Sequence, residues 1–292
     1  MEPQAITLSA REKPAGGRVV PVRASHAMPA VSRLVVLVHG YNNTAASAAA
    51  SYDEFAERIG SAAPGTFAFW TVAHFFWPGD KPWGTISGLS YPAEIGTAKQ
   101  AARELRIFLA KLTGPAGAPV EIAFVTHSLG GRLVLELLNE MPAAHLSPMV
   151  PLVCLMAPAV PVDRVERGGA LRAGAEMARR TAVFHSEHDA VLKWAFRFGQ
   201  AAAGEGFSSR AVGRFGEPRR GLWSVSMPTM HAHGAYWDAA NCAEEVARQL
   251  GAAPPRAIAA RVLPRSDRLK PVPTPAFPVR SSAPARSRGS RR

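Results

Sequence analysis

Short apolar runs alternate along this chain with longer segments whose apolar residues recur at helical spacing. The first run, residues 33–38, is apolar at nearly every position, which is typical of a strand buried on both faces of a parallel sheet. Strands are predicted at residues 33–38, within 67–76, and at 120–125, 152–156, 181–185 and 222–226, and helices at 47–59, 95–112, directly after 128, and from about 239 to 250.

Strands that alternate with helices indicate βαβ units on a parallel sheet. The sequence therefore predicts an α/β fold, in which a doubly wound, mostly parallel sheet is flanked by helices. Residues 31–251 are expected to form this domain. Residues 1–30 mix Pro, Gly, Ala and charge and predict a loose N-terminal lead-in, where residues 18–23 fit an edge strand because Pro is tolerated there. Residues 252–292 hold eight prolines with Ser and Arg and predict a basic, disordered tail.

The net charge is concentrated in this tail. It carries ten of the 34 Lys and Arg residues and one of the 22 acidic residues, so most of the formal net charge of +12 belongs to it. Phosphate contacts would let such a tail bind a polyanion or an anionic membrane surface, but a solvated tail without a partner is the simpler interpretation. The apolar runs are shorter than the roughly 18 residues that a transmembrane segment needs. Two cysteines make no disulfide framework, and we expect a cytoplasmic protein.

The most informative motif joins a predicted strand to a predicted helix. Residues 126–132 read Thr-His-Ser-Leu-Gly-Gly-Arg, between the strand at 120–125 and apolar residues with helical spacing. A serine on so tight a turn presents its hydroxyl outside the sheet, as the nucleophile motif G-x-S-x-G requires. Ser128 is therefore the predicted nucleophile. Thr126 replaces the first glycine of that motif, and because a side chain there takes up space, a shifted turn is expected.

A nucleophilic serine needs a base and a carboxylate that orients the base. In open α/β sheets such groups lie just after strand ends. Asp189 follows the predicted strand at 181–185 and is the preferred acid, although an aspartate there could instead cap the next helix. Asp163 is the second choice and Glu187 a weaker third.

The base is expected last in chain order. Residues 230–237 follow the last predicted strand and contain two histidines. His233 is preferred because its loop carries a glycine next to an aromatic pair, and His231 stays open as the alternative.

Acyl transfer also needs two N–H groups that stabilise the oxyanion. Gly40, at the end of the strand at 33–38, lets the backbone bend so that the following N–H faces the site. The backbone N–H groups of Tyr41 and of Leu129, the residue after the nucleophile, are the predicted oxyanion hole. His39 is interpreted as a buried hydrogen-bonding residue, not as a proton-transfer group.

Four segments, residues 36–41, 126–131, 186–192 and 233–237, together resemble the α/β-hydrolase superfamily, and most closely its bacterial esterase/lipase-like branch. The resemblance covers about residues 31–250. It implies the α/β-hydrolase fold and a serine hydrolase that acts on an ester or similar acyl bond without a cofactor. The sequence shows no cluster with metal-ligand spacing and no phosphate-binding glycine loop.

The expected activity is cleavage of a carboxylester or lipid-type acyl bond in a small-molecule acyl ester, through an acyl-enzyme on Ser128. Aromatic residues near the predicted strand ends fit either an acyl pocket or ordinary core packing: Phe75, Phe76, Trp77 and Trp83, and Trp194, Phe196, Phe198, Phe207 and Phe215 in the long segment 193–221. The alternative function is a catalytically silent hydrolase-fold protein whose basic tail contacts a polyanion or membrane surface. The intact set of serine, acid and base argues against that alternative.

Overall fold

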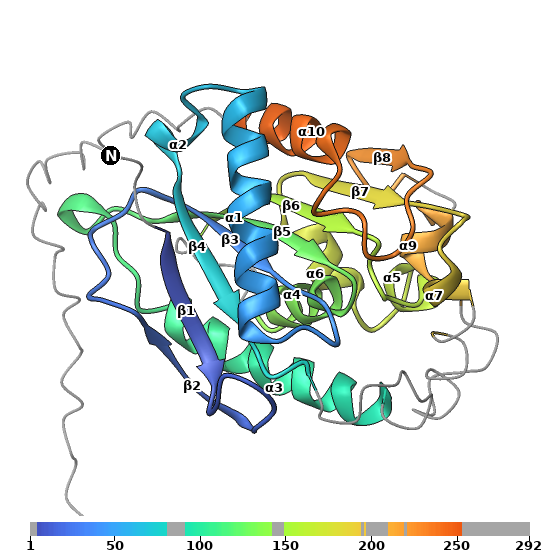
Figure 1. Ribbon diagram of the computed structural model, residues 1–292, viewed down its shortest axis with the longest axis horizontal. Coiled ribbons are helices and arrows are strands. Elements are labelled where there is room, and N and C mark those ends of the chain that lie inside the picture. The colour runs from blue at the N-terminus through green and yellow to red at the C-terminus, as the bar shows by residue number, and fades with distance from the viewer. Residues whose placement is uncertain are drawn as a thin grey trace, which may run out of the picture. The chain divides into compact units, whose positions relative to one another are not determined.

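The fold is organised around an eight-stranded sheet with the strand order β2-β1-β4-β3-β5-β6-β7-β8 (Figure 1). The computed structural model describes residues 5–80, 91–141, 149–193, 196, 210–218 and 221–252. β1 and β2 pair antiparallel, and the other neighbouring strands pair parallel. The strands are β1 (Ile6–Arg11), β2 (Val19–Ala24), β3 (Arg33–Val38), β4 (Thr71–Phe76), β5 (Glu121–His127), β6 (Met149–Met156), β7 (Thr181–His185) and β8 (Val225–Pro228).

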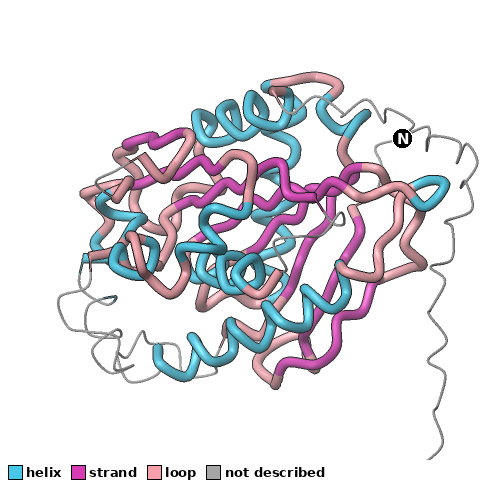
Figure 2. Tube along the Cα trace, turned by 180° about the vertical axis from the view of Figure 1, so that it is seen from behind, coloured by secondary structure: helices cyan, strands magenta, loops and turns pink. Residues whose placement is uncertain are grey.

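Helices cover both faces of the sheet (Figures 1 and 2). α1 (Ala45–Ala62) and α10 (Ala240–Gly251) pack together on one face, and α3 (Tyr91–Leu109), α4 (Leu129–Asn139) and α6 (Arg172–Met177) on the other. The predicted fold class, a mostly parallel α/β sheet with flanking helices, is therefore confirmed. The connections hold the shorter helices α2 (Thr66–Phe69), α5 (Val162–Val165), α7 (Ala190–Lys193) and α9 (Val212–Phe215) and the 3-10 turn η1 (Pro115–Gly117).

The central strands β3 and β5 are buried along their whole length, as expected for apolar strands with helices on both faces. Because β3 through β8 run in one direction, their carboxyl ends meet at the same edge of the sheet. The predicted site residues follow these ends. The fold thus brings segments from distant parts of the chain to one edge.

The first 30 residues hold more regular structure than a loose lead-in. β2 covers the segment expected to form an edge strand, but β1 was not predicted, and it lies inside the sheet between β2 and β4. Its apolar Ile6, Leu8 and Ala10 are buried, and the residues between them are half-buried. Five residues with period two are too short a pattern to distinguish from a loop by sequence.

The chain divides into residues 1–254 and residues 255–292. The elements above lie in the first unit, and residues 253–292, nearly all of the predicted tail, lie outside the described residues. In the described part of the chain, no helix combines the length and apolarity needed to cross a bilayer.

Candidate active site

Ser128 occupies the sharp turn between β5 and α4. Its φ of 54° and ψ of −122° lie in a region that residues with side chains rarely adopt, at a cost of about 1–3 kcal/mol. Three backbone hydrogen bonds hold the turn: the Ser128 N–H donates to the Met156 carbonyl (2.9 Å), and the Ser128 carbonyl accepts from the N–H groups of Gly131 and Ala159 (both 3.0 Å). The strained conformation of this serine is therefore fixed by its surroundings.

Two glycines let the end of β3 approach this turn. A Cβ atom on Gly130 would lie 2.4 Å from the His39 carbonyl oxygen, and one on Gly40 would lie 2.8 Å from the Ser128 Cβ. Neither separation is tolerated between non-bonded atoms, so only glycine permits this backbone contact. Gly40 therefore lies against Ser128, and Tyr41 is the next residue along the chain.

Thr126 packs between the Cys154 carbonyl and Gly131. Its hydroxyl donates a hydrogen bond to the Cys154 carbonyl (3.2 Å), and a Cβ on Gly131 would lie 3.3 Å from that hydroxyl oxygen. Thr126 stands where the motif has its first glycine, and the missing side chain of Gly131 leaves room for it.

His233, in the loop between β8 and α10, contacts the other two predicted residues. Its Nε2 lies 2.8 Å from the Ser128 Oγ, and its Nδ1 lies 2.7 Å from the Asp189 Oδ2. Because a carboxylate only accepts hydrogen bonds, the ring carries its proton on Nδ1 and donates it to Asp189. The lone pair on Nε2 therefore faces the serine hydroxyl. The preferred serine, acid and base form one chain of hydrogen bonds.

The Asp189 carboxylate is fully buried and has two partners. Oδ2 accepts from His233, while Oδ1 accepts from the backbone N–H of Leu192 (2.8 Å) in the first turn of α7. The Asp189 carboxylate thus accepts a hydrogen bond in the first turn of α7 and another from the ring of His233. The alternatives Asp163, in the first turn of α5, and Glu187 are exposed.

His231, the alternative base, lies in a different environment. Its Nε2 contacts the Oδ1 of Asn241 (2.9 Å) on α10, and its ring meets the Tyr236 ring edge-on at 5.5 Å. The structure therefore ties His231 to α10 and brings His233 to the serine.

The two N–H groups predicted for the oxyanion hole belong to residues beside Ser128. Leu129 is the first residue of α4, and backbone N–H groups in the first helical turn have no partner within the helix. Tyr41 follows Gly40 on the other side of the turn, and His39 fixes its peptide. The His39 Nε2 accepts from the Trp77 N–H (3.3 Å), so its Nδ1 carries the proton and donates to the Gly40 carbonyl (2.8 Å).

This bond sets the direction of the Tyr41 N–H, because the carbonyl and the N–H of a trans peptide point in opposite directions. Burial lowers the pKa of His39 to about 4, which keeps the ring in the neutral form that this arrangement requires. His39 is thus a buried hydrogen-bonding residue, in agreement with its interpretation from sequence.

Comparison with known proteins assigns the chain to a family. Residues 24–206 match the model of a family described as "Alpha/beta hydrolase of unknown function (DUF900)". The chain belongs to this family. The predicted resemblance to α/β hydrolases is therefore confirmed, and the sheet has the α/β-hydrolase fold. No curated protein matches the sequence significantly.

Solved structures with a similar chain trace include other α/β hydrolases. An extracellular α/β-hydrolase from a Paenibacillus species has a TM-score of 0.40 at 9% identity, covering 75% of this chain and 98% of that one. An esterase from Rhizomucor miehei has a TM-score of 0.41 at 13% identity, covering 80% and 78%. A gene product from Listeria innocua has a TM-score of 0.40 at 9% identity, covering 74% and 92%.

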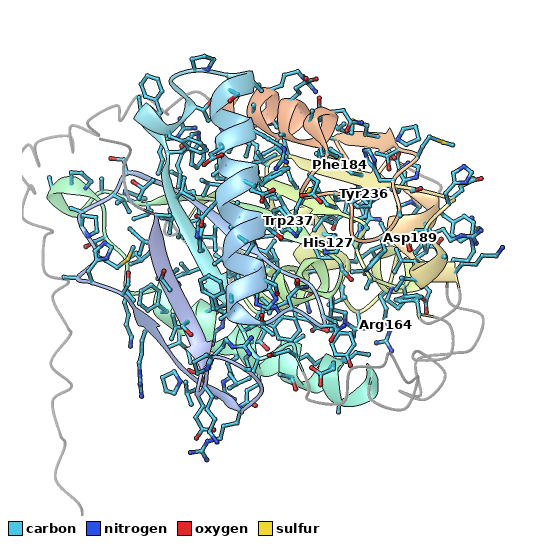
Figure 3. All side chains as sticks on the ribbon, in the orientation of Figure 1. His127, Arg164, Phe184, Asp189, Tyr236 and Trp237 are labelled. Carbon is cyan, nitrogen blue, oxygen red and sulfur yellow. The ribbon has the colours of Figure 1, made fainter. Side chains whose placement is uncertain are left out.

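His127 of this hydrolase was not identified from sequence. Its Nε2 donates to the backbone carbonyl of His233 (2.7 Å), and the two rings lie 4.9 Å apart. The His127 ring also lies near those of Tyr236 and Trp237 (Figure 3). Burial, and then the neighbouring His233, lower the pKa of His127 to about 3, so the ring is neutral. His127, the residue before Ser128, thus holds the backbone of His233. Its place in an apolar strand next to Ser128 was the only available signal.

The aromatic residues Phe75 and Phe76 at the end of β4, and Trp77 directly after it, are buried in the core. Phe75 and Trp77 are fully buried, and the Trp77 indole N–H donates to the His39 carbonyl (2.9 Å) while its ring stacks on the His39 ring. For these residues core packing is the correct interpretation. In the segment 193–221, Phe196 is buried, and the Phe215 ring contacts the guanidinium groups of two arginines, Arg210 and Arg214. The other aromatic residues named for a pocket, Trp83, Trp194, Phe198 and Phe207, lie outside the described residues.

Where the structure describes the chain, no group of three His, Cys, Asp or Glu side chains is arranged to hold a metal ion. His185 and His188, which precede Asp189, belong to no such group. The His185 ring instead packs against Gly216, where an added Cβ would lie 2.5 Å from its Nε2.

Proposed function

We propose that this protein is a serine hydrolase that cleaves a carboxylester or lipid-type acyl bond through an acyl-enzyme on Ser128. The observation that carries the proposal is the hydrogen-bond chain from Ser128 through His233 to Asp189, with both distances below 3 Å. A serine hydroxyl is a weak nucleophile until a base accepts its proton. The hydrogen bond from His233 Nδ1 to Asp189 leaves the His233 Nε2 unprotonated and so able to accept that proton.

In the first half of the reaction, the Ser128 Oγ attacks the ester carbonyl carbon while His233 Nε2 accepts the hydroxyl proton. The carbonyl electron pair moves onto the oxygen, where the backbone N–H groups of Tyr41 and Leu129 stabilise the charge. The tetrahedral intermediate collapses as the bond to the alcohol oxygen breaks. That oxygen takes the proton from His233, leaving the acyl group on Ser128.

In the second half, a water molecule attacks the acyl carbon and gives a proton to His233. The bond between the acyl carbon and the Ser128 Oγ then breaks, and the oxygen recovers its proton from His233. Ester and water are consumed, and carboxylic acid and alcohol are released. During both halves the Asp189 carboxylate stabilises the imidazolium form of His233.

A fluorophosphonate probe tests the nucleophile. We expect it to label the wild type and to leave Ser128→Ala unlabelled. Hydrolysis of p-nitrophenyl esters should fall by about 10⁴-fold or more in Ser128→Ala and in His233→Ala. His231→Ala is the matched control, because it removes a nearby histidine that contacts Asn241, and it should keep the wild-type rate.

Two results would overturn the proposal: labelling that persists in Ser128→Ala, or a wild type that hydrolyses none of a panel of esters with increasing acyl length. The second result together with an unlabelled wild type would favour the catalytically silent alternative. That alternative relies on the basic tail, beyond the described residues, and gains no support from the structure. The ester panel also measures the preferred acyl length, which pocket shape decides.

A further inference from the structure

The strands β1 and β2 and the turn between them, residues 6–24, form an N-terminal hairpin. Through Arg11 this hairpin reaches the side of the candidate site that holds Tyr41, which we call the oxyanion side. β1 runs parallel to β4 with Ser9 opposite Phe76, so Arg11 lies level with the residues that follow β4. Its side chain is only 2% exposed. This arginine precedes the part of the chain that matches the family model, so it belongs to an element outside that match.

The Arg11 guanidinium binds two loops at once. One of them, the oxyanion loop, is residues 39–43, and the other, the support loop, is residues 77–80. Nη1 donates to the Trp77 carbonyl (2.8 Å) and reaches the Asn43 carbonyl (3.5 Å), while Nη2 pairs with the Asp80 carboxylate. The other Asp80 oxygen accepts the N–H of Gly16 in the hairpin turn (3.0 Å).

The support loop in turn holds the oxyanion loop. The Gly79 carbonyl accepts the N–H of Asn42 (2.7 Å), the residue directly after Tyr41. Asn42 has a φ of 62°, in the left-handed region that asparagine adopts more readily than most other residues with a side chain. Trp77 contributes its backbone and indole N–H groups to His39, which orients the Gly40–Tyr41 peptide. A displacement of the support loop would therefore move the Tyr41 N–H.

We propose that Arg11 is a positioning residue for the oxyanion hole: it fastens the support loop and the oxyanion loop to the N-terminal hairpin and so fixes the Tyr41 N–H. The inference rests on the proposed serine hydrolase activity. The planar fork of arginine presents donors in several fixed directions, whereas lysine offers a single ammonium on a flexible stem. Lysine at this position would keep the charge beside Asp80 and lose the simultaneous contacts with both loops.

The test compares Arg11→Lys with Arg33→Lys. Arg33 is the matched control, because it also forms a buried ion pair, with Glu121 at 3.0 Å, and is 7% exposed. Arg33 and Glu121 lie opposite each other at the starts of β3 and β5, at the other edge of the sheet. Both substitutions disturb a buried arginine–carboxylate pair, but only one of these pairs touches the oxyanion side.

The readouts are kcat and KM for an ester and for the matching thionoester, in which sulfur replaces the carbonyl oxygen. Sulfur accepts hydrogen bonds weakly, so an intact oxyanion hole favours the ester. For Arg11→Lys we expect ester kcat to fall about 10- to 100-fold with KM nearly unchanged, since a small misplacement of a catalytic group costs up to about 10²-fold. The ester-to-thionoester ratio should fall about tenfold. Arg33→Lys should keep both values within about twofold of wild type.

A wild-type kcat and ratio in Arg11→Lys, or equal losses in the two variants, would overturn the inference. If Arg11→Lys does not fold, the double variant Arg11→Gln/Asp80→Asn is measured against the same criteria. It removes both charges of this ion pair, so neither is left buried without its partner. The proposed function is tested separately, by fluorophosphonate labelling of the wild type at Ser128. A labelled, ester-cleaving wild type with an unaffected Arg11 variant would refute the inference and leave the proposed function standing.

Discussion

Acidification should destabilise this protein through two buried histidines in the candidate site, His127 and His39. Burial lowers the pKa of His127 to about 3 and that of His39 to about 4, from 6.5 in the unfolded chain. Their folded-state pKa values are depressed, so the unfolded state binds the proton first. Stability from this source is complete above about pH 6.5 and is lost as the pH falls toward the folded pKa values.

The magnitude follows from proton binding. Between pH 6.5 and 5 the excess of protons that the unfolded chain holds over the folded protein rises from about one half to nearly one at each of these positions. Each unit of pH costs about 1.4 kcal/mol per such proton, so each histidine removes about 2 kcal/mol on going from pH 7 to pH 5. For a domain whose free energy of unfolding is typically about 5–15 kcal/mol, the two together are a large fraction.

Urea unfolding of the wild type and of His127→Gln at pH 7 and pH 5 measures this effect. A glutamine amide still donates to the His233 carbonyl but does not titrate. His127→Gln should therefore lose about 2 kcal/mol less than the wild type between these two pH values, and His39→Gln should behave likewise. Thr126→Val is the matched control, since it removes a buried hydrogen bond beside His127 without removing a titrating group. Its stability should fall by about 1 kcal/mol, equally at both pH values.

An identical pH dependence in the wild type and in His127→Gln would refute this reasoning. It would mean that the ring is already charged at pH 5, or that water reaches it, in contradiction to its burial and to its contact with a backbone carbonyl.

Three further substitutions test the geometry of the site. Gly130→Ala would place a methyl group 2.4 Å from the His39 carbonyl oxygen, so we expect thermal unfolding to show a loss of about 1–3 kcal/mol or more, together with reduced kcat. Asp189→Asn should keep the fold, because an amide oxygen still accepts from the Leu192 N–H, yet kcat should fall about 10⁴-fold since the ring of the base loses its tautomer control; an unchanged kcat would remove Asp189 from the mechanism. His231→Gln should keep kcat within about twofold, and a loss of several orders of magnitude would contradict the assignment of the base.

The elements predicted well are those whose burial follows from sequence alone. β3 and β7 have the bounds predicted for them, because most of their positions are apolar and nearly all of them are buried, as in strands covered on both faces. β8 is different: it begins at Val225, while the predicted strand began at residue 222. Trp223 is buried ahead of the strand, and β8 itself is only half-buried at the sheet edge. The apolar residues that predicted the strand therefore begin before the residues that pair with β7. The helices of four to six residues are too short to show any period.

The positions brought together at the site were predictable to the extent that they follow strand ends. Ser128, Asp189 and His233 come after β5, β7 and β8, and a parallel sheet collects such positions at one edge. Their supporting residues leave no comparable trace. Arg11 contacts Trp77, 66 positions away, and nothing in the sequence distinguishes it from the other arginines of the first 30 residues, Arg18 and Arg23. A residue that acts by donating to a backbone carbonyl far away in the sequence can be identified only once the fold is known.

The histidines His39, His127 and His233 show why residue type alone does not assign a role. His39 and His127 each donate to a backbone carbonyl, and a carbonyl offers a buried cation far less compensation than a carboxylate does. Burial therefore keeps both rings neutral, and each acts as a fixed donor that orients backbone. His233 alone has a carboxylate on Nδ1 and a hydroxyl at Nε2, so it alone can take a proton from the serine and share the resulting charge with an anion. The partner of each ring, and not the ring itself, thus separates the proposed base His233 from the two histidines that orient backbone.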